Sequence, residues 1–82
     1  DCVNFAAGFG KGAETFHQQP QSGAWIFNNY FRKGHGAVVT GSHTGAWIEN
    51  VRAEDNVMYM TDVGLRMKMA VGCGMCCSVI MR

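Results

Sequence analysis

Charged side chains are scarce in this 82-residue sequence. Only 16% of the residues are Asp, Glu, Lys or Arg, against about a quarter in ordinary soluble proteins. Seven basic and six acidic side chains leave a formal net charge of +1. So small a charge gives no broad electrostatic field that could hold a nucleic acid or an anionic membrane. We therefore expect nucleic acid not to be a partner.

Long apolar runs are also missing, although 48% of the residues are apolar. No run approaches the roughly 18 apolar residues that a membrane-spanning helix needs, so such a helix is excluded. The sequence begins at Asp1 and shows no basic segment followed by an apolar core, as a secretory leader would. We expect a mature chain cut from a longer precursor, with Arg82 at a cleavage site that follows a basic residue.

Cysteine is absent from the long stretch between Cys2 and Cys73, and two more thiols follow at Cys76 and Cys77. Four cysteines in a short chain favour disulfides and an oxidising compartment. Of the three possible pairings, the one that joins the neighbours Cys76 and Cys77 is strained. The others join Cys2 to Cys76 or Cys77 and leave Cys73 in a small ring. Closing a loop of about 70 residues would stabilise the fold by roughly 4 kcal/mol, so we expect a secreted, extracellular, disulfide-stapled protein.

The apolar pattern predicts one α+β domain over residues 1–82, with a small antiparallel sheet and one main helix packed on it. The helix begins at a Ser22 cap, repeats Phe27 and Phe31 on one face, and ends before Gly34. Alternation predicts strands, the one over 65–71 with both of its cations, Arg66 and Lys68, on one side. The predicted strands cover residues 1–7, 37–40, 46–51, 57–61, 65–71 and 77–81.

Two nearly identical heptapeptides, Ser22–Asn28 and Thr44–Asn50, lie 22 residues apart. A duplicated unit would have similar surroundings in both copies. The first heptapeptide lies in the predicted helix and the second in a predicted strand, and the similarity stops outside the seven positions. We interpret it as coincidence.

Methionine and cysteine raise two further chemical possibilities. Met58 with Met60 and Met67 with Met69 could gather thioethers near the Cys73–Cys76 motif and hold a soft ion such as Cu(I). The spacing of that motif also suits a dithiol redox centre. Core packing by methionine and a structural disulfide are the stronger interpretations. We therefore expect no cofactor and no metal.

A ribonuclease is the alternative function that the polar residues suggest. General acid–base cleavage of RNA needs a base, an imidazole acid and a cation, and these roles could be filled by His43, Glu49, His35 and Arg52. The segment Val39–Gly45 resembles the histidine-bearing strand of the small fungal guanyl-specific ribonucleases. That resemblance implies an extracellular enzyme.

The predicted helix carries more aromatic surface than one face can bury. Surplus apolar side chains on an isolated helix are typical of a binding surface. The candidate binding residues are Trp25, Phe27, Tyr30 and Phe31 on the helix and Trp47 on a strand.

In overall character the chain resembles the secreted killer toxins and small effector proteins of fungi. The resemblance is carried by Asp1–Cys2, the cysteine cluster Cys73–Cys77, the high glycine content and the final Arg82. It implies a toxin or antimicrobial protein that binds a target-cell surface or membrane and catalyses no reaction. A further alternative is one subunit of a heterodimer, with a sister chain from the same precursor, or a homo-oligomer.

Overall fold

The computed structural model describes residues 1–8, 19–68 and 77–82, and its regular structure in these ranges consists of strands. In the same ranges no helix is long and apolar enough to cross a membrane. The described residues form eight strands: β1 (Val3–Phe5), β2 (Gln21–Phe27), β3 (Tyr30–Gly34), β4 (Val38–Thr40), β5 (Ile48–Glu54), β6 (Val57–Thr61), β7 (Leu65–Met67) and β8 (Cys77–Met81).

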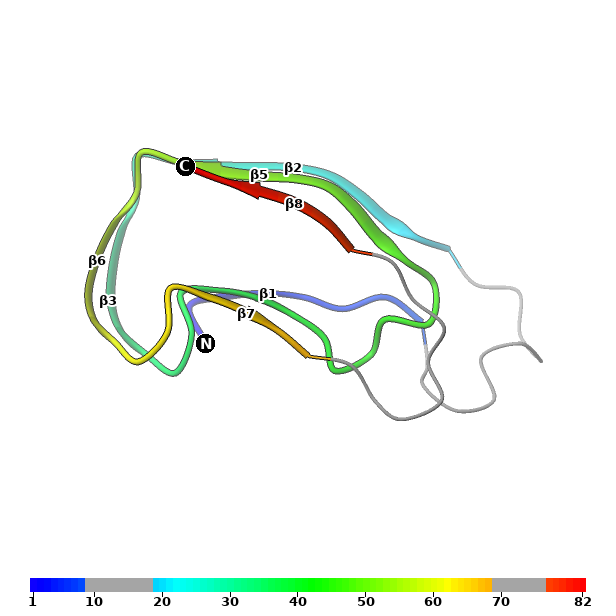
Figure 1. Ribbon diagram of the computed structural model, residues 1–82, viewed down its shortest axis with the longest axis horizontal. Coiled ribbons are helices and arrows are strands. Elements are labelled where there is room, and N and C mark those ends of the chain that lie inside the picture. Colours follow the sequence, from blue (N-terminus) through cyan, green and yellow to red (C-terminus); the bar gives the residue numbers. More distant parts are fainter. Residues whose placement is uncertain (9–18, 69–76) are drawn as a thin grey trace.

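The described strands form three parallel sheets: β1-β4-β7, which we call sheet A, β2-β5-β8, sheet B, and β3-β6, sheet C. Sheets A and B face each other as two layers, and sheet C closes one end (Figure 1). The chain visits A, B and C in turn and then returns to A beside the strand it left. This winding is a parallel β-helix.

The strand pairs β2–β5, β3–β6 and β4–β7 are in a 27-residue register, whereas β1 and β4 are offset by 35 residues and β5 and β8 by 28 or 29. Gln21 pairs with Ile48 in sheet B, and Tyr30 pairs with Val57 in sheet C. Left-handed backbone positions repeat with the same spacing, which bends neighbouring coils at the same points. The pairs are Gly23 with Asn50, Asn28 with Asp55, and Lys33 with Met60, all with φ between 55° and 80°. The two heptapeptides, 22 residues apart, are therefore out of phase with the coils.

The predicted α+β fold with an antiparallel sheet is wrong. The segment expected to be one helix forms β2 and β3, separated by a corner at Asn28. In β2, Ala24 and Ile26 are half-buried while Trp25 and Phe27 are exposed, which is the two-residue period of a strand. The sheet is parallel because each strand pairs with the next coil and not with a hairpin partner.

Several strands lie where the sequence predicted them, although their pairing is different. Those over 57–61 and 77–81 match β6 and β8, and β4 lies within the one predicted over 37–40. The strand predicted over 65–71 is β7 as far as Met67, and its last residues lie outside the described ranges. Period-two alternation therefore located strands correctly in this half of the chain.

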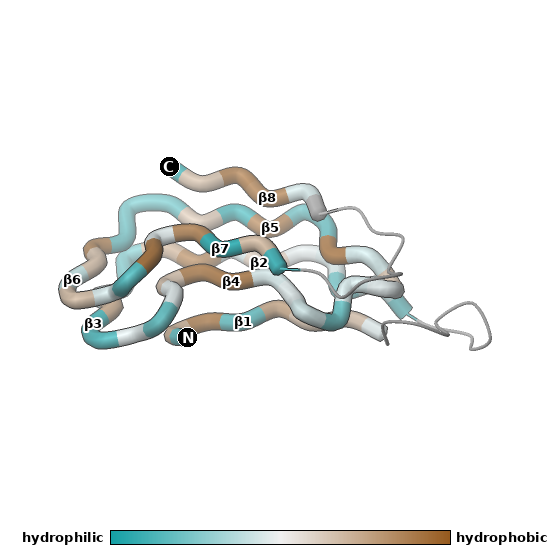
Figure 2. Tube along the Cα trace, turned by 60° about the horizontal axis from the view of Figure 1, so that its bottom comes forward, coloured by the Kyte–Doolittle hydropathy of each residue, from teal (hydrophilic) through white to brown (hydrophobic). Residues whose placement is uncertain are grey.

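The interior of the coil is filled mainly by small aliphatic side chains, with Phe31 among them. Hydrophobic stretches lie side by side on β1 and β4 (Figure 2). The first buried cluster consists of Ala7, Ala46, Ile48 and Val51, and the second of Phe31, Ala37, Val38 and Ala53. The outer face of sheet B carries both charged side chains such as Arg52 and exposed aromatic ones such as Trp25 and Phe27.

The predicted disulfide from Cys2 to the end of the chain is not formed. Cys2 carries a free thiol, is half-buried and packs against the second core cluster. It precedes β1 in sheet A, whereas Cys77 begins β8 in sheet B, so the two lie in different layers. Cys73 and Cys76 lie outside the described residues, as does Met69, so the soft-metal and dithiol alternatives fall there too.

Candidate functional site

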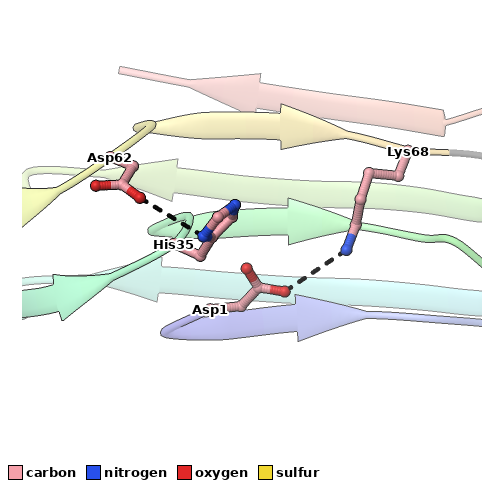
Figure 3. Close-up of polar contacts among 4 residues, drawn as sticks. All are labelled: Asp1, His35, Asp62 and Lys68. Carbon is pink, nitrogen blue, oxygen red and sulfur yellow. Dashed lines mark ion pairs between the residues drawn. The ribbon is translucent and has the colours of Figure 1, made fainter.

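Five ionisable side chains gather beside sheet A, and we call them the sheet A cluster: Asp1, His35, Asp62, Arg66 and Lys68. Asp1 precedes β1, His35 lies in the β3–β4 turn, and Asp62 lies in the β6–β7 turn. Arg66 belongs to β7, and Lys68 follows that strand. Figure 3 shows that Asp1 and Lys68 approach each other across the sheet, and that His35 and Asp62 do so beside it.

The parallel ladder of sheet A places Asp1 beside Gly36. The amide of Cys2 donates to the Gly36 carbonyl at 2.8 Å, and the next amide along, that of Val3, donates to Ala37 at 2.9 Å. A Cβ atom added to Gly36 would lie 3.5 Å from Asp1 Oδ1 and 3.7 Å from Arg66 Cβ. Asp1 and Arg66 therefore flank Gly36, one on each neighbouring coil.

The two cations of the cluster differ in their partners. Lys68 Nζ lies 3.7 Å from Asp1 Oδ2, and these side chains are 32% and 25% exposed. Arg66 is half-buried, and in the described part of the chain no carboxylate lies within ion-pair distance of it. The Arg66 guanidinium is therefore open to an anion from outside the described residues.

His35 has its own carboxylate. Its Nδ1 atom lies 3.5 Å from Asp62 Oδ2, and the two side chains are 66% and 70% exposed. When the imidazole is protonated this contact is an ion pair. Among the described residues the cluster thus consists of the Asp1–Lys68 ion pair, the His35–Asp62 contact and Arg66, which has no carboxylate partner there.

Gly36 leaves no room for a side chain in this site. An added Cβ would lie 2.4 Å from Cγ2 of Val39, which is fully buried in β4 and pairs with Arg66 of β7. We expect Gly36→Ala to cost about 1–3 kcal/mol of unfolding free energy through overpacking and to displace Asp1 or Arg66. Thermal unfolding measures the loss. Gly64→Ala is the matched control, because its Cβ would meet only the flexible Met58 thioether at 3.3 Å, and equal losses would contradict the prediction.

The predicted ribonuclease residues are not brought together. His35 belongs to the sheet A cluster, whereas Glu49 and Arg52 are exposed on β5 of sheet B, in the other layer (Figure 1). His43 is exposed in the segment between β4 and β5, where its carbonyl accepts from the amide of Ala7. A general acid–base site cannot form from residues divided between two layers.

The predicted aromatic binding residues separate into exposed and buried ones. Phe31 is 8% exposed and belongs to the core, while Trp25, Phe27, Tyr30 and Trp47 are exposed. The Trp25 and Phe27 ring centroids are 4.2 Å apart, and Trp25 Nε1 donates to Glu54 Oε1 at 2.7 Å. A binding role for these four exposed aromatic residues stays a prediction.

Four residues of the sheet A cluster were not among the predicted site residues: Asp1, Asp62, Arg66 and Lys68. The two cations had a visible signal, because the alternating pattern over 65–71 puts them on one side of a strand. No pattern in the sequence pointed to the two carboxylates. Asp1 and Asp62 reach the site through pairing between coils, which the local sequence does not encode.

No protein-family model matches the sequence. The chain is 58% identical over 74 residues to the exo-poly-α-D-galacturonosidase of Dickeya chrysanthemi, a match that covers 90% of this chain and 12% of that protein. Its structure matches the family 28 exopolygalacturonase of Yersinia enterocolitica with a TM-score of 0.84 and 57% identity, over 100% of this chain and 15% of the other. The chain therefore spans only a small part of the length of either protein.

These similarities correct the predicted function. The two proteins are galacturonide-degrading enzymes, so the predictions of a killer toxin, effector or antimicrobial protein, of a ribonuclease and of a non-enzyme are wrong. The predicted partners, a target-cell membrane, a sister chain or a homo-oligomer, are replaced by a galacturonide substrate in these relatives. The toxin resemblance depended on chain ends, cysteines and glycine content, which do not identify a substrate.

The predicted extracellular location is compatible with the similarity to an exo-poly-α-D-galacturonosidase. Along its full length, the chain is similar to one segment of the parallel β-helix of a family 28 exopolygalacturonase.

Proposed function

We propose that this chain is a segment of a secreted family 28 polygalacturonase and that the sheet A cluster is part of its substrate-binding surface. The observation that carries the proposal is Arg66, a half-buried cation with no carboxylate partner among the described residues, beside Lys68 and Asp1. The 58% identity to an exo-poly-α-D-galacturonosidase supports it.

The cluster has the chemistry that an acidic polysaccharide requires. Each galacturonate unit carries a carboxylate, and a guanidinium binds a carboxylate through two parallel hydrogen bonds. Lys68 adds a second positive charge close by, although it shares this charge with Asp1. Local cations of this kind contact the carboxylates of the polymer directly.

Asp1 supplies a carboxylate next to these cations. Hydrolysis of a glycosidic bond uses a pair of Asp or Glu side chains, one on each side of the bond. Asp62, the other carboxylate of the cluster, lies against His35. We therefore propose that Asp1 takes part in the reaction and that its partner carboxylate comes from outside this segment, which spans 15% of the similar solved chain.

The test is to express the full open reading frame that contains this segment and to measure sugar release from polygalacturonate. We expect activity, and we expect Arg66→Ala to raise KM by about 10-fold or more, because a charge-assisted contact to a carboxylate contributes about 1.5–3 kcal/mol. Arg52→Ala is the matched control, since Arg52 is an exposed arginine of sheet B. It should leave KM unchanged.

Two results would contradict the proposal. One is a folded full-length protein that releases no sugar from polygalacturonate. The other is an Arg66→Ala variant whose KM equals that of Arg52→Ala. Fully methyl-esterified polymer provides a substrate control: it lacks the carboxylates, so the difference between the wild-type protein and Arg66→Ala should shrink on it.

A further inference from the structure

We propose that Asp62 is a positioning residue for His35. Its carboxylate holds the proton on Nδ1 of the imidazole, and so presents Nε2 to a ligand at the sheet A cluster. The identity of that ligand, a galacturonide, rests on the proposed function. The orientation of the ring rests on the geometry alone.

Pairing between coils places the two residues side by side. Gly34 and Thr61 form the last pair of β3 and β6, and the amide of Asp62 donates to the Gly34 carbonyl at 2.9 Å. His35 and Asp62 are the residues that follow this pair on neighbouring coils. The backbone therefore brings their side chains together before any contact between them forms.

The contact distinguishes the two nitrogens of the ring. Asp62 Oδ2 lies 3.5 Å from Nδ1 of His35, and Nε2 is on the opposite side of the imidazole (Figure 3). In a neutral imidazole one nitrogen donates and the other accepts, and a carboxylate beside one of them favours the proton at that nitrogen. Asp62 therefore selects the form in which Nε2 carries a lone pair.

No other carboxylate of the cluster competes for this role. Asp1 lies within ion-pair distance of Lys68, whereas the structure places only Asp62 within that distance of His35 among the described residues. Both members of the His35–Asp62 pair are about two-thirds exposed, and exposed pairs add little to stability. Removing the charge of Asp62 should therefore leave stability nearly unchanged, so an effect on the ring can be measured separately.

The experiment compares the full-length wild-type protein with Asp62→Asn, which keeps the shape of the side chain and removes its charge. Long-range proton–nitrogen spectra of labelled histidine are recorded at about pH 8, where histidines are usually neutral, and His35→Ala identifies the signal. We expect the Nδ1-protonated form in the wild-type protein and a shift towards the Nε2-protonated form in Asp62→Asn. With polygalacturonate, kcat should fall about 5-fold while KM changes less than about twofold, as expected for a misplaced group.

Asp55→Asn is the control for loss of a surface carboxylate, because Asp55 is exposed in the β5–β6 turn. It should change neither the spectrum nor kcat. An unchanged His35 spectrum in Asp62→Asn would overturn the proposal whatever happens to activity or to the melting temperature. A wild-type protein inactive on polygalacturonate would instead defeat the proposed function, while the spectral shift would still establish the orienting role of Asp62.

Discussion

Replacing Gly41 with alanine is expected to lower the free energy of unfolding by about 3 kcal/mol or more, through a left-handed backbone and a backbone clash together. Gly41 has φ of 95°, and an added Cβ would lie 1.9 Å from the carbonyl oxygen of Lys68 and 2.7 Å from its carbonyl carbon. These are main-chain atoms that cannot rotate away. Thermal unfolding of the full-length protein measures the effect.

The clash occurs where all three strands of sheet A are tied together. The amide of Gly41 donates to the Phe5 carbonyl, and the amide of Lys68 donates to the Thr40 carbonyl, both at 2.8 Å. Moving Lys68 would also disturb its contact with Asp1, so any surviving activity should show a raised KM. Loss of stability and loss of substrate affinity are therefore expected together.

Gly23→Ala separates the two causes. Gly23 has φ of 80° but nothing within 4 Å of an added Cβ, so this variant should cost only the left-handed backbone penalty of about 1–2 kcal/mol. If Gly41→Ala proves no more damaging than Gly23→Ala, the close approach to Lys68 has no energetic importance.

Asn56→Ala should be the second most damaging substitution, at about 2–3 kcal/mol for three lost hydrogen bonds. The Oδ1 atom of Asn56 accepts from the backbone amide and from the side-chain amide of Asn29, at 3.0 and 3.1 Å. Its Nδ2 atom donates to the Ile26 carbonyl at 3.0 Å. These bonds join two successive coils at the corner between sheets B and C.

Asn4→Ala is the control for this prediction. Asn4 is exposed on β1, and no side-chain hydrogen bond of it occurs in the described ranges, so it should change stability by less than about 0.5 kcal/mol. Asn56→Asp keeps both acceptor bonds and loses the donor, and its melting temperature should be intermediate. Melting temperatures that are equal for Asn56→Ala and Asn4→Ala would show that the corner does not depend on this side chain.

The same corner explains why a helix was expected over a segment that forms two strands. Phe27 ends the outward alternation of β2, and Phe31 is buried in β3 after the left-handed turn at Asn28. The sequence alone does not reveal this turn. Without it, the four-residue spacing of Phe27 and Phe31 matches the period of a helix. Local patterning located β6 and β8 because no corner interrupts them, but it cannot encode pairing between strands 27 residues apart.

The site could be predicted only in part for a related reason. His35 was predicted as a site residue together with Glu49 and Arg52, which lie on the other sheet, because a single sequence does not show which coils are neighbours.

An even number of cysteines suggested disulfides, yet Cys2 is a free, half-buried thiol beside the core. Its contribution is apolar packing, which a count of cysteines does not reveal.

The sheet A cluster takes its side chains from three rungs of the coil: Asp1 from the first, His35 from the second, and Asp62, Arg66 and Lys68 from the third. Adjacent rungs of a sheet are about 4.8 Å apart. Exchange of the first or the second rung with that of a related protein would therefore replace one side chain of the cluster, whereas exchange of the third would replace three. A surface built in this way allows specificity to change stepwise during evolution without refolding the whole molecule.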